Sequence, residues 1–293
     1  MNIRDLKYLV SLSETKHFRK AAEQCFVSQP ALSMQIQKLE DTLGIQLFER
    51  SNKEVIITET GKKVIEKAKQ ILLIEKEIYE IAENFQNPLS GSLKIGAFPT
   101  LAPYIFPEIV PKIHSELQDL KLFLIEEKTG SLIEELENGD LDIALLALPI
   151  ESPVLDYIEL FDDSFYLAVS QNHKLANKKS ITYDELANTK LLLLEEGHCL
   201  RNQSLDVCSI IGINEKEDFR ATSLETLRQM VLAEIGITLI PEIAKNDNDN
   251  IIYIPFCNNI PKRTIALAYR KTFQRTEVIH RIKDIVKNTI TQN

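Results

Sequence analysis

The stretch Phe18 to Gly44, FRKAAEQCFVSQPALSMQIQKLEDTLG, predicts two packed helices near the amino-terminal end of the chain. In its first part, apolar residues recur at helical spacing, and two adjacent alanines allow another helix to approach closely. After a short turn, Ser28 is suited to cap a second helix that has Pro30 in its first turn. The apolar residues expected on the buried faces are Phe18, Ala21, Ala22 and Cys25, followed by Leu32, Ile36, Leu39 and Leu43.

The opposite face of the second helix carries Gln29, Ser33 and Gln37, which lie four residues apart. Such a row of hydrogen-bonding side chains can contact base edges in a major groove, where Gln can pair with adenine through two hydrogen bonds. An ordinary solvated helix face is the alternative. A polar helix that starts with proline and follows another packed helix favours DNA recognition. A further helix, capped by Asn2, is expected at the start of the chain.

A long helix is predicted from Thr58, its expected N-cap, to Asn87, where Pro88 ends it. Apolar residues spaced alternately three and four apart form a seam of about three heptads. The helix could lie on its own domain, but a seam between two domains is more simply explained by dimerisation. The seam residues are Val64, Ile71, Ile74, Ile78, Ile81 and Phe85.

Beyond Pro88 the pattern changes to strands that alternate with helices, which predicts an α/β domain with a largely parallel sheet. The first series comprises strands at Ser92–Phe98, Leu120–Glu126 and Leu141–Leu148, with helices near Tyr104–Leu117 and Leu132–Asn138. The second comprises strands at Phe165–Ser170, Lys190–Glu195, Ile237–Pro241, Ile251–Phe256 and Thr264–Arg270, with helices at Leu224–Ala233 and near Glu277–Ile290.

Length and charge set further bounds. With 293 residues and 44% hydrophobic content, more than one domain is expected. No apolar run approaches the roughly 18 residues that span a bilayer, and no signal-peptide pattern is present, so a cytosolic protein without a membrane partner is expected. The net charge is −9, but residues 1–63 hold ten basic and eight acidic residues. The amino-terminal part is therefore the part that tolerates a phosphate backbone.

Cys199 and Cys208 are spaced like a reactive and a resolving thiol, and His198 directly precedes the first. The composition of Leu200 to Cys208 suits a short helix with Cys199 in its first turn. If residues 199–208 were helical, the Cα atoms of the two cysteines would lie roughly 13 Å apart. A disulfide requires roughly 4.4–6.8 Å, so oxidation would require local refolding, as in a redox switch. Two buried cysteines that act as small apolar residues are the alternative.

Other cysteine chemistry is less favoured. Cys25 and Cys257 are interpreted as packing residues. A metal site at His198 and the neighbouring cysteines lacks any CxxC or HxxxH spacing, so neither a metal nor another cofactor is expected.

Several runs resemble the peroxide-sensing regulators of the LysR-type family: Gly197–Gln203 with Cys208, Phe219–Arg228, Phe18–Ala22, Val27–Ser33 and Leu39–Gly44. The resemblance implies a winged helix-turn-helix over residues 1–58, with wing strands at 47–50 and 55–58, and a linker helix over residues 59–87. The remainder, residues 88–293, would be a regulatory domain like type 2 periplasmic binding proteins. Its subdomain I would span about 88–164 and 264–293, and its subdomain II about 165–263.

The same resemblance assigns roles to single residues. Cys199 would attack hydrogen peroxide and then condense with Cys208, while Thr100 and Thr129 would hold the peroxide. His198 and Arg263 would support the thiolate. In the DNA-binding part, Arg50 would contact the DNA backbone beside Gln29, Pro30, Ser33 and Gln37. Two positions depart from the family: Asp218 stands where a histidine is common, and the wing tip, residues 51–54, is less basic than in many relatives.

The leading hypothesis is a DNA-binding transcriptional regulator switched by hydrogen peroxide, working as a homodimer or homotetramer with RNA polymerase at promoters in a bacterial cytoplasm. A LysR-type regulator that senses a small organic ligand between its subdomains is the first alternative. A thiol peroxidase using His198 and Cys199 is the second, and the helix-turn-helix counts against it.

Overall fold

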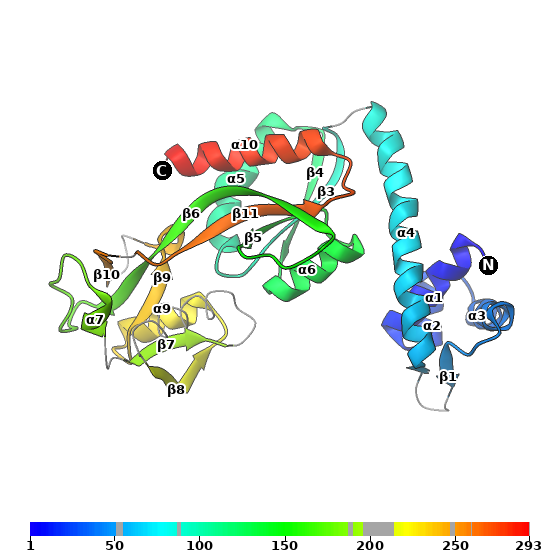
Figure 1. The fold of residues 1–293 in the computed structure, drawn as a ribbon, viewed down its shortest axis with the longest axis horizontal. Helices are drawn as coiled ribbons and strands as arrows, with labels where there is room; N and C mark the ends of the chain where they lie inside the picture. Colours follow the sequence, from blue (N-terminus) through cyan, green and yellow to red (C-terminus); the bar gives the residue numbers. More distant parts are fainter. Residues whose placement is uncertain are drawn as a thin grey trace. The chain divides into compact units, whose positions relative to one another are not determined.

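The computed structural model describes residues 1–50, 55–86, 89–186, 190–195, 214–246, 250–258 and 260–292. The chain forms two compact units, Met1–Phe85 and Gln86–Asn293 (Figure 1). Each unit has its own buried core. They are therefore described separately.

The first unit is built from three short helices, a two-stranded wing and one long helix. Its elements are α1 (Ile3–Thr15), α2 (Phe18–Gln24), α3 (Gln29–Leu43), β1 (Phe48–Arg50), β2 (Val55–Ile57) and α4 (Glu59–Gln86). β1 and β2 pair antiparallel. These elements confirm the helix-turn-helix, the wing strands and the long helix that the sequence predicts.

The predicted helix caps are confirmed by hydrogen bonds. Asn2 and Asp5 form a reciprocal capping box at α1, and Oγ of Ser28 accepts from the N–H of Ala31 at 3.4 Å. Oγ1 of Thr58 accepts from the N–H of Gly61 at 2.8 Å before α4. Each cap satisfies a backbone donor that would otherwise lack a partner in the first turn of its helix.

The buried stripe of α3 is shorter than predicted. Leu32, Ile36 and Leu39 lie in the core of the first unit, whereas Leu43 is 36% exposed. Leu43 is the last helical residue before Gly44, whose φ of 69° ends α3 in the left-handed region. The prediction that Leu43 is buried was therefore wrong, because Leu43 is the last residue of α3 and lies directly at its exposed C-cap.

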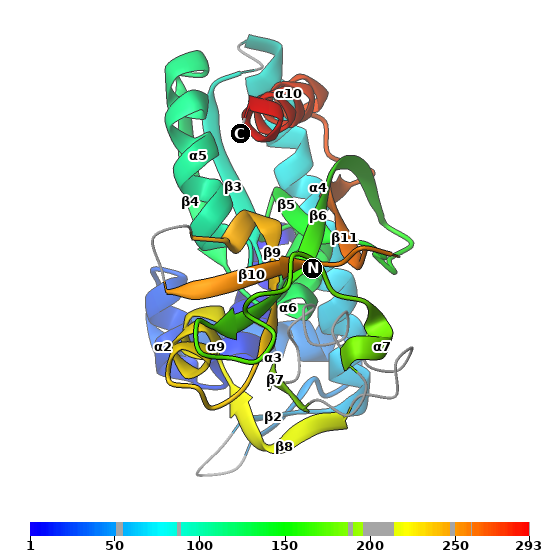
Figure 2. The same ribbon diagram turned by 90° about the vertical axis from the view of Figure 1, so that its left-hand side faces the viewer.

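The second unit alternates strands and helices around one main sheet (Figures 1 and 2). In chain order its elements are β3 (Gly91–Ala97), α5 (Ala102–Glu116), β4 (Leu120–Glu126), α6 (Thr129–Asn138), β5 (Ile143–Ala147), β6 (Leu155–Ser170), α7 (Tyr183–Leu186), β7 (Lys190–Leu194), β8 (Asn214–Ala221), α9 (Leu224–Leu232), β9 (Thr238–Pro241), η1 (Glu242–Ala244), β10 (Ile251–Pro255), β11 (Lys262–Arg270) and α10 (Thr276–Gln292). The predictions did not include α7 or β8.

The main sheet has the order β10-β6-β11-β5-β3-β4, with β9 also paired to β6. β3 pairs in parallel with β4 and β5, and the other pairings in this sheet are antiparallel. The prediction of a largely parallel sheet was wrong for this reason. β7 and β8 form a separate parallel pair.

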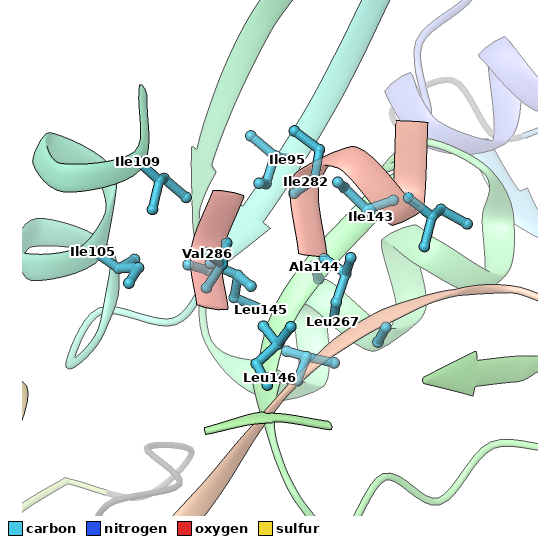
Figure 3. Packing of buried hydrophobic residues seen from close by; sticks show 14 of the residues in the cluster. Ile95, Ile105, Ile109, Ile143, Ala144, Leu145, Leu146, Leu267, Ile282 and Val286 are labelled. Atoms are coloured by element: carbon cyan, nitrogen blue, oxygen red, sulfur yellow. The ribbon is translucent and has the colours of Figure 1, made fainter. Parts of the chain in front are cut away.

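A first core forms around β3, β5 and β11 and contains side chains from α5, α6 and α10. A Cβ atom on Gly96 would lie 2.7 Å from a methyl carbon of Leu132, so Gly96 faces α6 at a spacing that only glycine permits. Its neighbour Ile95 must face the other side of the strand. Figure 3 shows Ile95 among residues of α5 and α10, so helices cover both faces of this part of the sheet.

β6 belongs to two parts of the unit. Its residues 155–164 pair with β11, whereas residues 165–170 pair with β10 and β9. From Phe165 onward its buried side chains join two further clusters, which together include residues of β7, α9, β9 and β10. We call the segments around the first core the first lobe, and the segments around the two further clusters the second lobe. β6 begins ten residues before the start that the sequence predicts, because exposed acidic residues in its first half interrupt the apolar pattern of a strand.

Candidate functional site

Arg263 lies at the centre of a buried hydrogen-bond network where β6 and β11 pair. Its Nε donates to Oδ2 of Asp163 at 2.9 Å, and its Nη1 donates to Oγ1 of Thr100 at 2.9 Å. Its Nη2 donates to the carbonyl oxygen of Thr100 at 3.1 Å. All three residues are at most 2% exposed. We call Thr100, Asp163 and Arg263 the arginine cluster.

The charge of Arg263 is balanced inside the protein. Nη2 of Arg263 lies 2.8 Å from Oδ2 of Asp163, and Oδ1 of Asp163 accepts from the N–H of Ile243 at 3.1 Å. Burial raises the pKa of the Asp163 carboxyl, while Arg263 and this N–H act in the opposite direction. The rings of Phe98 and Phe165 lie 5.0 and 5.8 Å from the guanidinium carbon, so the pair sits among groups that favour a cation.

Asp163 is a functional candidate that the sequence analysis missed. It follows Asp162 directly in β6, where the apolar residues Phe161 and Phe165 flank this polar stretch. Asp162 points to the surface and contacts Lys262 at 2.6 Å, whereas Asp163 is buried. The acidic pair in an otherwise alternating stretch was the available signal, because one member of such a pair must face the core.

Thr129 opens α6 and has a different environment. Its Oγ1 is buried and has no hydrogen-bond partner among the described residues. The preceding residue, Lys128, occupies the N-cap without a side-chain capping bond. Its Nζ contacts Oε1 of Glu195 at 2.6 Å. Neither Lys128 nor Glu195 was singled out by the sequence analysis.

Thr100 and Thr129 follow neighbouring parallel strands, β3 and β4, whose last residues Ala97 and Glu126 are in register. The carboxyl ends of parallel strands meet at one edge of the sheet, where ligands bind in open α/β folds. Both threonines therefore lie at the same edge of the sheet. The structure joins Thr100 to Arg263 directly.

The predicted cysteine switch lies outside the described residues. This applies to His198, Cys199 and Cys208, and to the predicted short helix from Leu200. The described chain ends at Glu195 after β7 and resumes at Asn214 in β8, which pairs with β7. Their roles remain predictions.

The residues predicted to read DNA lie on α3. Gln29, Pro30 and Gln37 are exposed, and Ser33 is half-buried. Arg50 ends β1, and its side chain lies outside the described part of the chain, as does the wing tip at residues 51–54.

Glu40 positions the wing relative to α3. Its buried Oε1 accepts from the N–H groups of Leu47 and Phe48, at 2.8 and 3.1 Å. The carboxylate thus links α3 to the start of β1. The role of Glu40 was not predicted from the sequence, because an acidic residue on a helix is usually solvent-exposed.

One face of α4 packs on its own unit and another is exposed. Ile65 and Ala68 are buried in the first unit's core, whereas Ile71, Ile74 and Ile78 are 38%, 57% and 61% exposed. The side chains of the later seam residues, Ile81 and Phe85, lie outside the described part, as do Asn87 and Pro88.

The two described cysteines differ from each other. Cys25 is half-buried and packs against the first unit's core, in line with its predicted packing role. Cys257 is exposed, and its Sγ lies 3.6 Å from the carbonyl oxygen of Ile181. The packing prediction for Cys257 was wrong, because the chain turns outward after the buried Phe256.

Two family descriptions match the chain. Residues 3–62 match the bacterial regulatory helix-turn-helix protein, lysR family, and residues 86–290 match the LysR substrate binding domain. The chain therefore belongs to the LysR family of DNA-binding transcriptional regulators. Such a protein is not an enzyme, so the thiol peroxidase alternative falls.

Several similar proteins within this family are hydrogen peroxide-inducible genes activators or OxyR proteins, which confirms the resemblance in the sequence. The hydrogen peroxide-inducible genes activator of Pectobacterium carotovorum is 46% identical over 92% of this chain and 90% of its own length. A full-length OxyR variant from Pseudomonas aeruginosa has a TM-score of 0.80 and 36% identity, with 98% of both chains covered. A Corynebacterium glutamicum OxyR mutant with bound hydrogen peroxide has a TM-score of 0.68 and 32% identity, covering 99% and 93%.

None of the described helices is long and apolar enough to cross a membrane. Within the same residues, no group of three or more His, Cys, Asp or Glu side chains could hold a metal ion.

Proposed function

We propose that this chain activates transcription in response to hydrogen peroxide through Cys199. The Cys199 thiolate attacks one peroxide oxygen, the O–O bond breaks, and hydroxide leaves as the sulfur becomes a sulfenic acid. The Cys208 thiol then attacks that sulfur, and water leaves as the disulfide forms. The peroxide is reduced and the two thiols are oxidised, so electrons balance. The relatives' names and the peroxide-bound OxyR structure support this proposal.

The observation that carries the proposal is the hydrogen bond that Nη1 of Arg263 donates to Oγ1 of Thr100. Because Oγ1 of Thr100 accepts from Nη1 of Arg263, its own hydrogen is free to be donated elsewhere. A hydroxyl polarised by a buried cation is a strong donor to the peroxide oxygen that gains charge as the O–O bond breaks. Arg263 would then act mainly through Thr100, and His198 would support the thiolate.

The hydroxyl of Thr129 supports the same site. A buried polar group without a partner is destabilising, and Oγ1 of Thr129 has none among the described residues. A small oxygen ligand at this sheet edge would satisfy it. Thr100 and Thr129 would then hold the peroxide from two neighbouring strands.

In the first unit, Gln29, Pro30, Ser33 and Gln37 would contact bases of promoter DNA, and Arg50 a phosphate. The exposed isoleucines of α4 would pair two chains into a homodimer, and a tetramer could form from two such dimers.

The disulfide would refold the segment after Glu195 and alter the contacts between regulatory domains. RNA polymerase would be the partner at the promoter, in a bacterial cytoplasm. The functional parts would be residues 1–58, 59–87 and 88–293.

The test is thiol counting with peptide mapping under non-reducing conditions after one equivalent of peroxide. We expect two thiols to disappear and one peptide pair to link Cys199 with Cys208. Cys199→Ser should abolish the response, whereas Cys208→Ser should accumulate a sulfenic acid that dimedone traps.

A sensor of small organic ligands is the second candidate. This candidate is favoured by a crevice of about 480 Å³. The crevice is lined by residues of α5 and α10 from the first lobe and by residues of η1 from the second. If both cysteines remain free thiols after peroxide treatment while DNA binding responds to an organic ligand, this candidate replaces the first.

A further inference from the structure

One ion pair links the two lobes beside the segment that carries the cysteines. Nζ of Lys128 lies 2.6 Å from Oε1 of Glu195. Lys128 directly precedes α6 in the first lobe, and Glu195 directly follows β7 in the second. The N–H of Glu195 also donates to the carbonyl oxygen of Ala221 at 2.9 Å, which anchors this residue to the β7–β8 pair.

Local helix preferences do not explain Lys128. It occupies the N-cap of α6 without a side-chain capping bond, where Ser, Thr, Asp or Asn would satisfy a backbone donor. A cation is also unfavourable at the positive end of the helix dipole. The carboxylate of Glu195 offsets the second disadvantage by placing an anion near this end. A residue that breaks a local rule in this way is often retained for function.

The pair lies next to groups assigned to sensing. Lys128 is bonded to Thr129, whose buried hydroxyl lacks a partner among the described residues. Glu195 precedes Cys199 by four residues in the chain. The ion pair therefore connects the backbone that carries one peroxide-binding hydroxyl to the backbone that leads into the reactive thiol.

We propose that Lys128 and Glu195 are positioning residues for the reaction of Cys199 with peroxide. They hold the amino end of α6 and the carboxyl end of β7 at a fixed separation, and so set where the chain leaves toward Cys199. This inference rests on the proposed function, because it presumes that Cys199 reacts. Neither side chain need touch the peroxide.

The chain offers a matched control. Lys178 and Glu185 form another Lys–Glu ion pair, with side chains 39% and 36% exposed, against 40% and 39% for Lys128 and Glu195. Both members of the control pair lie in the second lobe. Loss of either pair should have a similar effect on stability, but only the first pair crosses between the lobes.

The experiment measures the second-order rate constant of the Cys199 thiol with hydrogen peroxide in the full-length chain. Lys128→Gln and Glu195→Gln should each slow the reaction about two- to five-fold, the range expected for losing a partly exposed pair. The double variant should be no slower than either single one. Lys128→Arg and the exchange Lys128→Glu with Glu195→Lys should restore the rate, and Lys178→Gln should leave it unchanged. Thermal unfolding should shift equally in Lys128→Gln and Lys178→Gln.

The possible outcomes distinguish failure of this inference from failure of the proposed function. If the wild-type thiol does not react with peroxide, the proposed function fails. If the wild type reacts and Lys128→Gln reacts equally fast, only the positioning role fails. An equal slowing in Lys178→Gln would also overturn it, because the effect would then follow from general loss of charge pairs.

Discussion

The arginine cluster and the polar row on α3 satisfy opposite physical requirements. Thr100, Asp163 and Arg263 are buried and already bonded to one another. Gln29 and Gln37 on α3 are exposed, as groups that exchange water for base edges must be. The proposed peroxide site needs fixed donors in a dry environment, whereas the proposed DNA-reading surface needs free ones. Substitutions should therefore affect stability strongly in the first region and weakly in the second.

The largest loss of stability should follow Asp163→Ala. Removal of this carboxylate leaves Arg263 buried without its ionic partner, which typically costs about 3–5 kcal/mol of unfolding free energy. Urea denaturation of the full chain measures it. Asp162→Ala is the matched control: it loses an exposed pair with Lys262 and an exposed hydrogen bond from Thr264, so the loss should stay below about 1 kcal/mol. Equal losses in both variants would contradict the arrangement of the cluster.

Two threonine substitutions sharpen the comparison within the proposed peroxide site. Thr100→Val removes the Oγ1 acceptor of Nη1 of Arg263 and should lower the unfolding free energy by about 1–3 kcal/mol. Thr129→Val removes a hydroxyl without a partner among the described residues, so stability should change by less than about 1 kcal/mol. Both should slow the oxidation of Cys199, measured by stopped-flow mixing with peroxide. A normal rate in Thr129→Val would remove Thr129 from the site.

Replacement of both Ile74 and Ile78 by Asp should affect assembly more than the fold of one chain. Both side chains are exposed within one chain, so the helix itself should persist. Charges buried in a dimer seam would cost several kcal/mol of association free energy, and analytical ultracentrifugation should show smaller species with weaker DNA binding. Unchanged sedimentation and DNA affinity would rule out the seam.

The smallest stability effects belong to the DNA-reading row. Gln29→Ala and Ser33→Ala should each change the unfolding free energy by about 0.5 kcal/mol or less. Each should nevertheless reduce discrimination between cognate and scrambled DNA by about 1–3 kcal/mol at fixed salt. Arg50→Ala should weaken binding to both DNAs and make the salt dependence shallower. An unaltered specificity ratio in both α3 variants would assign α3 another role.

Local chemistry was predictable from the sequence. The caps at Asn2, Ser28 and Thr58, the helices of the first unit and most strands of the second depend on residues a few positions apart. The motifs that identify the family are likewise short and contiguous. Thr100 and Thr129 were assigned through the family resemblance. Such features can be read along the chain because propensity and capping act within one or two turns.

Contacts between distant segments were decided only by the tertiary structure. Arg263 meets Asp163 across 100 residues and Thr100 across 163, and Lys128 meets Glu195 across 67. The antiparallel return of β6 and β11, the exposure of Leu43 and the outward turn at Cys257 depend on which segments pack together. Residue types constrain what a side chain can bond, but the partner is selected by the packing of the whole unit, because a buried charge is stable only where the fold supplies its counter-charge.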